Sequence, residues 1–449
     1  MKKRFVGLLS TITLAACQPV GQGVPDHTAV HSFAHQSQSP HVYRANSDIA
    51  NEFMDFMFRN ELGGENPVFS RFDGPIVVRF AQSAPPLAQR DLKRLVARLR
   101  NEAGIDIRIG AADAPANIYI HRMPLAKLQN IAPNAACLVV PNARDVKEFR
   151  AGWRSGKTQW RNVKTRRIAS VFLPSDQSPQ TERDCMHEEV AQALGPLNDL
   201  FRVSNTIFND DNMHTVLTPY DMLILRMVYS PQLRIGMGPA QVREQLPDIL
   251  ARSNPKGNGY ARTGKSISLN WNAAIREGSN PSVSDQRRIN GAQRASKIAI
   301  AENLGQARVS FSILTHARAT LGRDPQARIA EYQRVLKSYH QTLGQDSVQV
   351  GKVSRELAFV LFQLGLVEEA STFVPVIKAA AQKYENAELM FEALHLQALI
   401  AHNGGNLPQY KALVAQARGW GLYAFGSIAT VSQIEHQIGK MAKDRKNTK

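Results

Sequence analysis

The sequence lacks the motifs that mark several common classes of enzyme. It contains no phosphate-binding P-loop, no G-x-S-x-G nucleophile elbow and no dinucleotide-binding glycine fingerprint. Nothing in its motifs therefore supports a nucleotide-dependent enzyme or a serine hydrolase of the α/β type. Hydrophobic residues still make up 43% of the 449 positions, so the chain can bury more than one core.

Beyond its first residues, the sequence also has no apolar run long enough to cross a bilayer as a helix. At the start of the chain, Lys2-Lys3-Arg4 precedes an apolar stretch over residues 5–14, which is too short to span a membrane in the mature protein. The lipobox Leu14-Ala15-Ala16-Cys17 follows. It predicts a signal peptide over residues 1–16, cleavage before Cys17 and acylation of the Cys17 thiol. An ordinary signal peptide with an incidental cysteine is the alternative.

The residue after the acylated cysteine predicts which membrane holds the protein. Gln18 stands where an aspartate typically retains bacterial lipoproteins in the inner membrane. We therefore expect a lipid-anchored protein of the cell envelope that faces the periplasm, held in the outer membrane in preference to the inner one.

Cysteine is scarce, with three residues in the whole chain. Once Cys17 is assigned to the lipid, Cys137 and Cys185 remain as an even pair in an oxidising compartment. We expect them to form a disulfide. Two free buried thiols are the alternative, and a Cys185 nucleophile paired with His187 is a weaker one because nothing in the pattern orients the base.

Strand and helix patterns follow one another between residues 75 and 230. Apolar runs predict strands over residues 75–80, 105–109, 116–120 and 168–173, and an amphipathic helix over residues 87–101. A further helix begins near residue 217, where Pro219 and Asp221 suit its first turn.

Histidines are missing from a helix that otherwise has the spacing of a zinc-protease helix. In the pattern H-E-x-x-H-x-x-G-x-x-H, three imidazoles hold zinc and the glutamate activates water. In this chain the three ligand positions are occupied by Glu188, Gln192 and Asn198. Glu189 stands at the base position and Gly195 at the bend, with Asp199 just beyond. An ordinary amphipathic helix that ends in Gly-Pro is the alternative; its apolar face would consist of Met186, Val190, Ala193, Leu194 and Leu197.

Together with Cys185-Met186-His187 before it and residues 208–212 after it, this segment resembles an uncharacterised proteobacterial lipoprotein domain, a domain of unknown function that is similar to a degenerate metzincin. The resemblance covers roughly residues 45–250. It implies an α+β, zincin-like fold in which a strand, a helix and further strands precede the motif helix. A metzincin would carry a methionine turn where this chain has Thr206-Ile207-Phe208. The family implies no assigned activity.

Composition divides the chain into six parts. We expect a signal peptide over residues 1–16, a tether rich in Gln, Ser, His and Pro over 17–44, and the degenerate metzincin-like domain over 45–252. A basic polar linker over 253–291, broken by a short element near residues 269–275, leads to an all-α domain over 292–437, and a basic tail covers 438–449.

Residues 357–370 of the all-α domain look like the turn of a tetratricopeptide-type helical hairpin, with a comparable turn at Gly404-Gly405-Asn406. Stacked hairpins form a concave surface, which we expect to bind a peptide or another envelope protein. A plain helical bundle with a structural role is the alternative.

Acidic residues are outnumbered by basic ones, 38 to 55, for a formal net charge of +17. Residues 153–167 contain no acid. Basic surface attracts anionic partners, and for an exported protein we expect an anionic lipid or glycan rather than nucleic acid. Solvated loop charges are the alternative. The basic residues of this segment are Arg154, Lys157, Arg161, Lys164, Arg166 and Arg167.

Two functions are compatible with these patterns. The favoured one is a membrane-anchored binding or scaffolding lipoprotein, a pseudoenzyme without metal or cofactor. The alternative is a peptidase-like hydrolase with Glu189 as general base, using a non-zinc metal or none. A ligand set made of oxygen donors suits a hard cation better than zinc.

Overall fold

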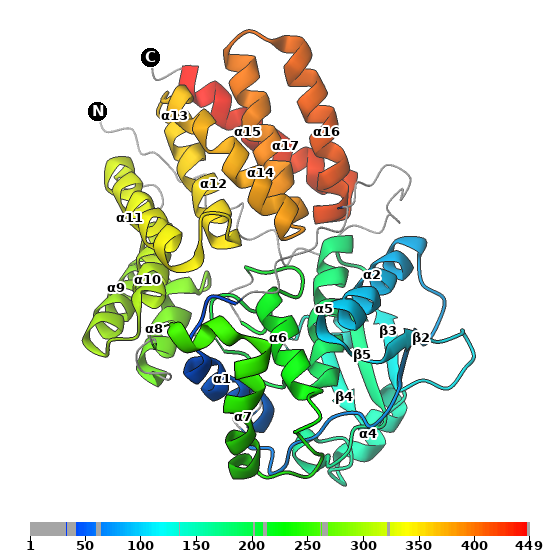
Figure 1. Ribbon diagram of the computed structural model, residues 1–449. Helices are drawn as coiled ribbons and strands as arrows, with labels where there is room; N and C mark the ends of the chain where they lie inside the picture. Colours follow the sequence, from blue (N-terminus) through cyan, green and yellow to red (C-terminus); the bar gives the residue numbers. More distant parts are fainter. Residues whose placement is uncertain are drawn as a thin grey trace. The chain divides into compact units, whose positions relative to one another are not determined.

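The computed structural model describes residue 33 and residues 42–59, 64–133, 135–200, 203–209, 213–260, 262, 268–320 and 324–446. It divides into two compact units, an α+β unit within residues 35–262 and a helical unit within residues 263–449, to which Phe33 also belongs (Figure 1). The fold class is therefore α+β with a helical C-terminal region. In the described part of the chain, no helix combines the length and apolar character that crossing a bilayer requires.

A five-stranded sheet forms the centre of the α+β unit. Its strands lie in the order β2-β1-β3-β5-β4, and all neighbours are parallel except β4, which runs antiparallel to β5. The sequence predicts every strand except β4. The strands are β1 (Ile76–Phe80), β2 (Ile107–Ile109), β3 (Ile118–Met123), β4 (Leu138–Pro141) and β5 (Ala169–Pro174).

Helices pack on both faces of this sheet. The long helices α2 (Pro86–Ala103) and α5 (Pro179–Leu194) cover one face (Figure 1), where Ile118 and Ile120 of β3 enter the main core. Two shorter helices, α3 (Leu125–Gln129) and α4 (Val146–Trp153), form a smaller core with Phe172 of β5 on the other face. A single turn, η4 (Trp160–Asn162), precedes β5.

Three further helices complete the α+β unit. They are α1 (Asn46–Phe58), α6 (Pro219–Val228) and α7 (Pro239–Ser253), followed by the turn η5 (Pro255–Gly259). Helix α1 packs on α7, and α6 packs on both α2 and α7. The Asn46 side chain joins the two ends of the unit, because its Nδ2 donates to the carbonyl of Asn254 at 3.1 Å.

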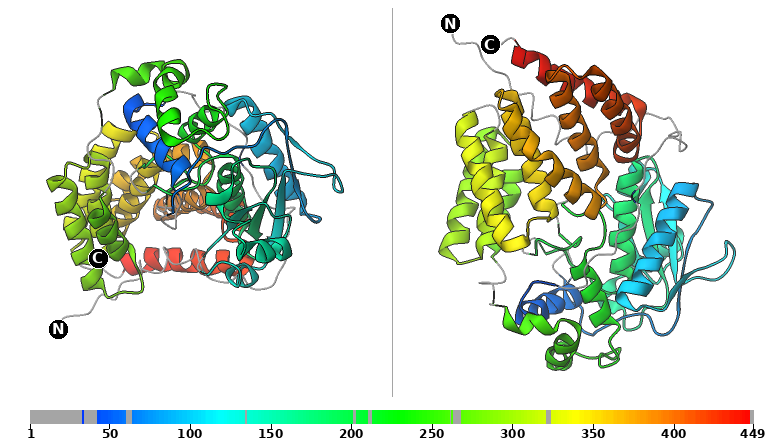
Figure 2. Two further views of the ribbon diagram at one scale, coloured as in Figure 1. Left: turned by 90° about the horizontal axis from the view of Figure 1, so that it is seen from below. Right: turned by 45° about the horizontal axis from the view of Figure 1, so that its top comes forward.

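The helical unit is a succession of helices that each pack on the next along the chain, while the last one also contacts α12 and α15 (Figure 2). These helices are α8 (Leu269–Ser279), α9 (Asp285–Ala301), α10 (Gln306–Ala319), α11 (Pro325–Leu343), α12 (Val348–Gln363), α13 (Val367–Thr372), α14 (Val374–Lys383), α15 (Ala387–Asn403), α16 (Leu407–Phe425) and α17 (Ile428–Lys446).

Both predicted hairpin turns lie where the sequence places them. The first separates α12 from α13, and Gly365 adopts the positive φ of 88° that this turn needs. The second lies between α15 and α16 at residues 404–406. The helix after the first turn is not continuous, because α13 ends before Phe373 and Pro375 lies in the first turn of α14.

The short element predicted near residues 269–275 lies in α8, but the structure differs from the rest of the predicted linker over residues 253–291, which also hold the first part of α9. Both helices look polar in sequence because one side of each is exposed, but Trp271 and Ile275 of α8 are buried. The Trp271 Nε1 donates to the Ser312 hydroxyl at 3.0 Å. The predicted boundary at residue 292 therefore falls inside α9.

The ends of the chain are described only in part. Cys17, the predicted signal peptide and most of the tether lie outside the described residues. Phe33 is an exception, since its ring centroid lies 4.4 Å from that of Trp420 in α16. Helix α17 continues to Lys446 and so includes much of the predicted tail.

Candidate functional site

The helix with the zinc-protease spacing is the C-terminal half of α5. The helix begins nine residues before Glu188, at Pro179, with the Ser178 hydroxyl accepting a hydrogen bond from the Thr181 amide at 3.1 Å. An ion pair between Arg122 of β3 and Glu182 fastens its first turn to the sheet. The helix thus has a capped and tethered start.

Helix α5 is buried on nearly all sides. Twelve of its sixteen residues are buried, so it differs from the amphipathic helix that the sequence suggests. Glu189 is 6% exposed and Gln192 is 5% exposed, although the helical wheel places Gln192 on a polar face. The side chains at the base position and the second ligand position therefore lie inside the unit.

The positions that would hold zinc do not fit that metal. Their donors are a carboxylate and two amides, with no imidazole among them, whereas zinc prefers nitrogen and sulfur ligands. The Asn198 amide is also engaged, because its Nδ2 donates to the carbonyl of Asp55 at 3.3 Å. Glu188 and Asp199 are half-buried. Among the described residues, no group of three or more His, Cys, Asp or Glu side chains is arranged to bind a metal ion.

His187 acts as a structural acceptor. Its Nδ1 accepts a hydrogen bond from the backbone amide of Leu217 at 3.2 Å, which ties α5 to the segment that leads into α6. Burial lowers the pKa of His187 well below its usual value, and the charges of Arg98 and Arg183 lower it further. The imidazole is therefore neutral at pH 7.

Gly195 ends α5, as the spacing predicts, and the reason is steric. A Cβ at this position would lie 2.8 Å from Cγ2 of Val228 in α6. The glycine therefore allows α5 and α6 to approach each other closely.

Arg166 fastens the C-terminal end of α5. Its Nη1 donates to the carbonyls of Gln192 at 2.7 Å and Ala193 at 2.8 Å, and its Nη2 donates to that of Gly195 at 2.6 Å. The Gln192 carbonyl also accepts from the Gly195 amide at 3.2 Å, whereas the last carbonyls of a helix lack partners within it, and the guanidinium complements the negative end of the helix dipole. Burial lowers the pKa of Arg166 to about 10, so the group keeps its charge at pH 7.

Neighbouring residues reinforce this end of the helix. Trp160 lies under the Arg166 guanidinium, 4.7 Å from it, and the Tyr229 hydroxyl donates to the Leu194 carbonyl at 3.2 Å. Arg71 plays the corresponding role for α6, since its Nη1 donates to the Val228 carbonyl at 2.6 Å. Two arginines therefore cap two adjacent helices.

A buried aspartate fixes the loop where a metzincin would carry its methionine turn. Asp221 is fully buried in the first turn of α6 and accepts hydrogen bonds from the Thr206 hydroxyl at 2.5 Å and the backbone amides of Ile207 at 3.1 Å and Thr218 at 2.7 Å. Burial raises the pKa of Asp221 to about 6, although these hydrogen bonds oppose the rise. The loop is thus anchored by a side chain of α6.

The two remaining cysteines are joined as predicted. Cys137, just before β4, and Cys185 of α5 form a disulfide with a Cα–Cα distance of 5.8 Å across 48 residues of sequence. The bridge links α5 to the segment that leads into the antiparallel strand. Cys185 is therefore not a free nucleophile.

The predicted basic surface is present except for one member. Arg154, Lys157, Arg161, Lys164 and Arg167 are exposed. Arg166 does not belong to this surface, because it is 2% exposed and caps α5. The sequence could not separate Arg166 from its neighbours, because the burial of its side chain depends on segments distant in sequence, such as that of Phe72, with which its backbone forms a bridge.

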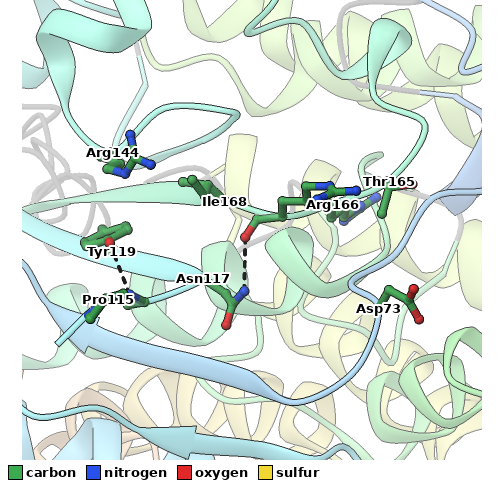
Figure 3. Close-up of a pocket in the computed structure, with 10 residues that line it drawn as sticks. Asp73, Pro115, Asn117, Tyr119, Arg144, Thr165, Arg166 and Ile168 are labelled. Atoms are coloured by element: carbon green, nitrogen blue, oxygen red, sulfur yellow. Dashed lines mark hydrogen bonds between the residues drawn. The ribbon is translucent and has the colours of Figure 1, made fainter.

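A pocket of about 480 Å³ lies at the amino ends of β1, β3 and β5 (Figure 3). Asn117 and Ile168 line it directly before β3 and β5, and Asp73 lines it just ahead of β1. Arg144 also lines it and lies at the same edge because it follows the antiparallel β4. Of the residues that line it, Arg166 and Arg167 belong to the predicted basic surface, whereas Asp73, Asn117 and Arg144 were not predicted. The predicted strand starts were a signal for these, since residues that precede parallel strands gather at one edge of a sheet.

Charged side chains in the helical unit pair with one another across helices. Arg318 of α10 binds Glu356 of α12 at 2.6 Å, and Arg355 of α12 binds Glu392 of α15 at 3.1 Å. Burial raises the pKa of Glu392 to about 7, and the charge of Arg355 opposes this rise. These pairs join helices α10, α12 and α15.

Comparison with curated proteins and with solved structures finds no match. The match to a known family covers the α+β unit from the start of α1 to within α7. Residues 46–248 match the family model described as Protein of unknown function (DUF2927), and this part of the chain is a DUF2927 domain.

Proposed function

We propose that this chain is a lipid-anchored protein of the cell envelope that binds or scaffolds other envelope components, and that its DUF2927 domain is a metzincin-like domain without peptidase activity. The observation that carries the proposal is the burial of α5. A general base must reach a water molecule next to the substrate, whereas Glu189 and Gln192 are at most 6% exposed and the Asn198 amide is bonded to the chain itself.

Other features support the individual parts of this proposal. The order of a strand, a helix, further strands and the motif helix is the one expected of a zincin-like domain. The lipobox at Cys17 supports the anchor, and the Cys137–Cys185 bridge suits an oxidising compartment such as the periplasm.

The two units suit different binding partners. The helical hairpins, which we propose are tetratricopeptide-like, suit a peptide or envelope protein. The exposed basic residues of the α+β unit suit an anionic lipid or glycan, and we propose no nucleic-acid partner.

Metal content and hydrolysis test the inactive part of the proposal together. We expect the purified mature protein to hold no stoichiometric metal and to show no chelator-sensitive cleavage of peptides or peptidoglycan. Glu189→Gln should change only stability, and the exposed Glu244→Gln serves as a matched control. Metal-dependent hydrolysis that disappears in Glu189→Gln, with the circular dichroism spectrum unchanged, would show instead that the chain is a hydrolase with Glu189 as its base.

A further inference from the structure

We propose that the pocket at the amino ends of β1, β3 and β5 binds a phosphate ester that also carries a hydroxyl or ammonium group. Phosphoethanolamine has this chemistry, either as a free molecule or as a lipid headgroup. The proposal goes beyond the one above, because it concerns a different site and holds whether or not α5 is catalytic.

The pocket has the size of a small-molecule site. Its volume of about 480 Å³ falls in the range of ligand pockets, roughly 300–1,000 Å³. Residues from four separate parts of the sequence line it, near positions 73, 117, 144 and 167. The sheet brings these segments together, and no one of them would form the pocket alone.

Two arginines of the pocket can bind an anion. Arg144 and Arg167 both line the pocket, and both are exposed. A guanidinium presents donors in a planar fork that matches the oxygens of phosphate. Arg144 also binds Glu148 through Nη1 at 3.1 Å, which orients its guanidinium.

The backbone on both sides of the pocket is held in place. Asn117 accepts from the Val77 amide at 2.8 Å and donates through Nδ2 to the carbonyl of Arg167 at 3.1 Å. The His121 Nε2 lies 2.8 Å from the carbonyl oxygen of Arg144. A site whose supporting groups are fixed in advance loses less conformational entropy when a ligand binds.

Asp73 adds a negative charge to a pocket that otherwise carries the positive charges of arginines. Its carboxylate lies across the view from Arg144 in Figure 3, and both side chains line the same pocket. An ionised carboxylate only accepts hydrogen bonds, so it would repel a second phosphate and favour an ammonium or a hydroxyl. The pair of arginines and the single carboxylate therefore match a ligand with one anionic end and one donor end.

The surroundings favour the approach of an anion. Lys157, Arg161 and Lys164 are exposed on the segment that leads to Arg167, and residues 153–167 contain no acid. The carbonyl of Lys157 accepts from Asn142 Nδ2 at 3.0 Å, which places this segment beside the end of β4. A surface of one sign raises the local concentration of oppositely charged ligands.

Calorimetric titration of the full chain with O-phosphoethanolamine tests the site, with ethanolamine as the probe that lacks phosphate. We expect binding of the phosphate ester alone, and binding at least tenfold weaker in Arg144→Ala and in Arg167→Ala. Arg90→Ala is the matched control, because Arg90 is an exposed arginine of the same unit that lies outside the basic segment and does not line the pocket. Asp73→Asn should weaken the binding of O-phosphoethanolamine and not that of inorganic phosphate.

Sedimentation with vesicles separates the two sources of the ligand. The Cys17→Ala chain is mixed with phosphatidylcholine vesicles that do or do not contain phosphatidylethanolamine. Binding to the mixed vesicles that is lost in Arg167→Ala, without binding of the free ester, identifies a lipid headgroup, and the reverse identifies a soluble ester. The proposal is overturned if neither probe binds, or if Arg90→Ala weakens binding as much as Arg144→Ala and Arg167→Ala do.

Discussion

The Nη2 of Arg166 donates a hydrogen bond of 2.6 Å to the carbonyl oxygen of Gly195. Arg166 belongs to a strongly basic segment, yet its side chain turns inward and caps the helix in which a zinc protease would keep its ligands. The same residue also lines the pocket that we propose to be a phosphate-ester site. The Arg166 side chain therefore contacts both the end of the buried motif helix and the pocket.

The cap makes Arg166 more important for stability than its exposed neighbours. Arg166→Ala removes the guanidinium that donates to three carbonyls at the end of α5 and should lower the free energy of unfolding by about 3 kcal/mol. That corresponds to a loss of roughly 6–12 °C in melting temperature for a unit of this size. Thermal denaturation followed by circular dichroism measures it. Arg161→Ala should shift the melting temperature little, and equal shifts in the two variants would contradict the capping role.

The disulfide should stabilise the α+β unit by constraining its unfolded chain. For a closed loop of 48 residues the expected contribution is about 4 kcal/mol. The mature acylated chain should show no titratable thiol until it is reduced, then two, and reduction should lower its melting temperature. Thiol titration with and without reductant decides the point, and two thiols in the oxidised native protein would rule the bridge out.

Asp221 predicts a pH dependence of stability. Its pKa is about 6 in the folded chain, whereas an unfolded aspartate has a pKa near 4, so the folded state holds the proton more tightly. The free energy of unfolding should therefore fall as pH rises from about 4 to about 6, by roughly 2–3 kcal/mol from this group.

The comparison that isolates this effect is between the native chain and Asp221→Asn. The native chain should lose melting temperature relative to the variant across that pH range and then stay level. A native chain that gains stability relative to the variant with rising pH would show that the three hydrogen bonds outweigh burial and keep the carboxylate ionised.

The helical unit should need α8 in order to fold well. Trp271 is 1% exposed in that helix and bonds to Ser312 of α10. A fragment that begins at Ser268 should melt cooperatively, whereas one that begins at Ala292 should melt at a lower temperature or aggregate, because the surface that packs on α8 becomes exposed. Circular dichroism melting of the two fragments compares them. Equal melting temperatures would mean that α8 adds nothing to the unit.

The proposed lipid anchor depends on a single thiol. Cys17→Ala removes the only acylation site that the lipobox offers, so the mature chain should leave the membrane fraction or remain unprocessed. Fractionation followed by immunoblotting measures this, with Cys137→Ala as a cysteine variant that should stay in the membrane fraction. Normal processing and unchanged membrane association of Cys17→Ala would disprove the anchor.

Local patterns were enough for much of the fold. Apolar runs located β1, β2, β3 and β5, since each buries residues toward one or both faces of the sheet. Gly365 and residues 404–406 marked the hairpin turns, because glycine takes the backbone conformations that end a helix. Counting the cysteines paired Cys137 with Cys185, because only two remained after the lipobox.

The sequence by itself determined the elements, the turns and the cysteine pair, because these depend on residues that are neighbours in the chain or few enough to count. Only the tertiary structure decided which polar residues are buried. It turned Arg166 inward, enclosed Glu189 and Gln192, and gathered Asp73, Asn117 and Arg144 around one pocket. The physical reason is that burial and proximity depend on how distant segments pack, and no local pattern of charge or hydrophobicity encodes that packing.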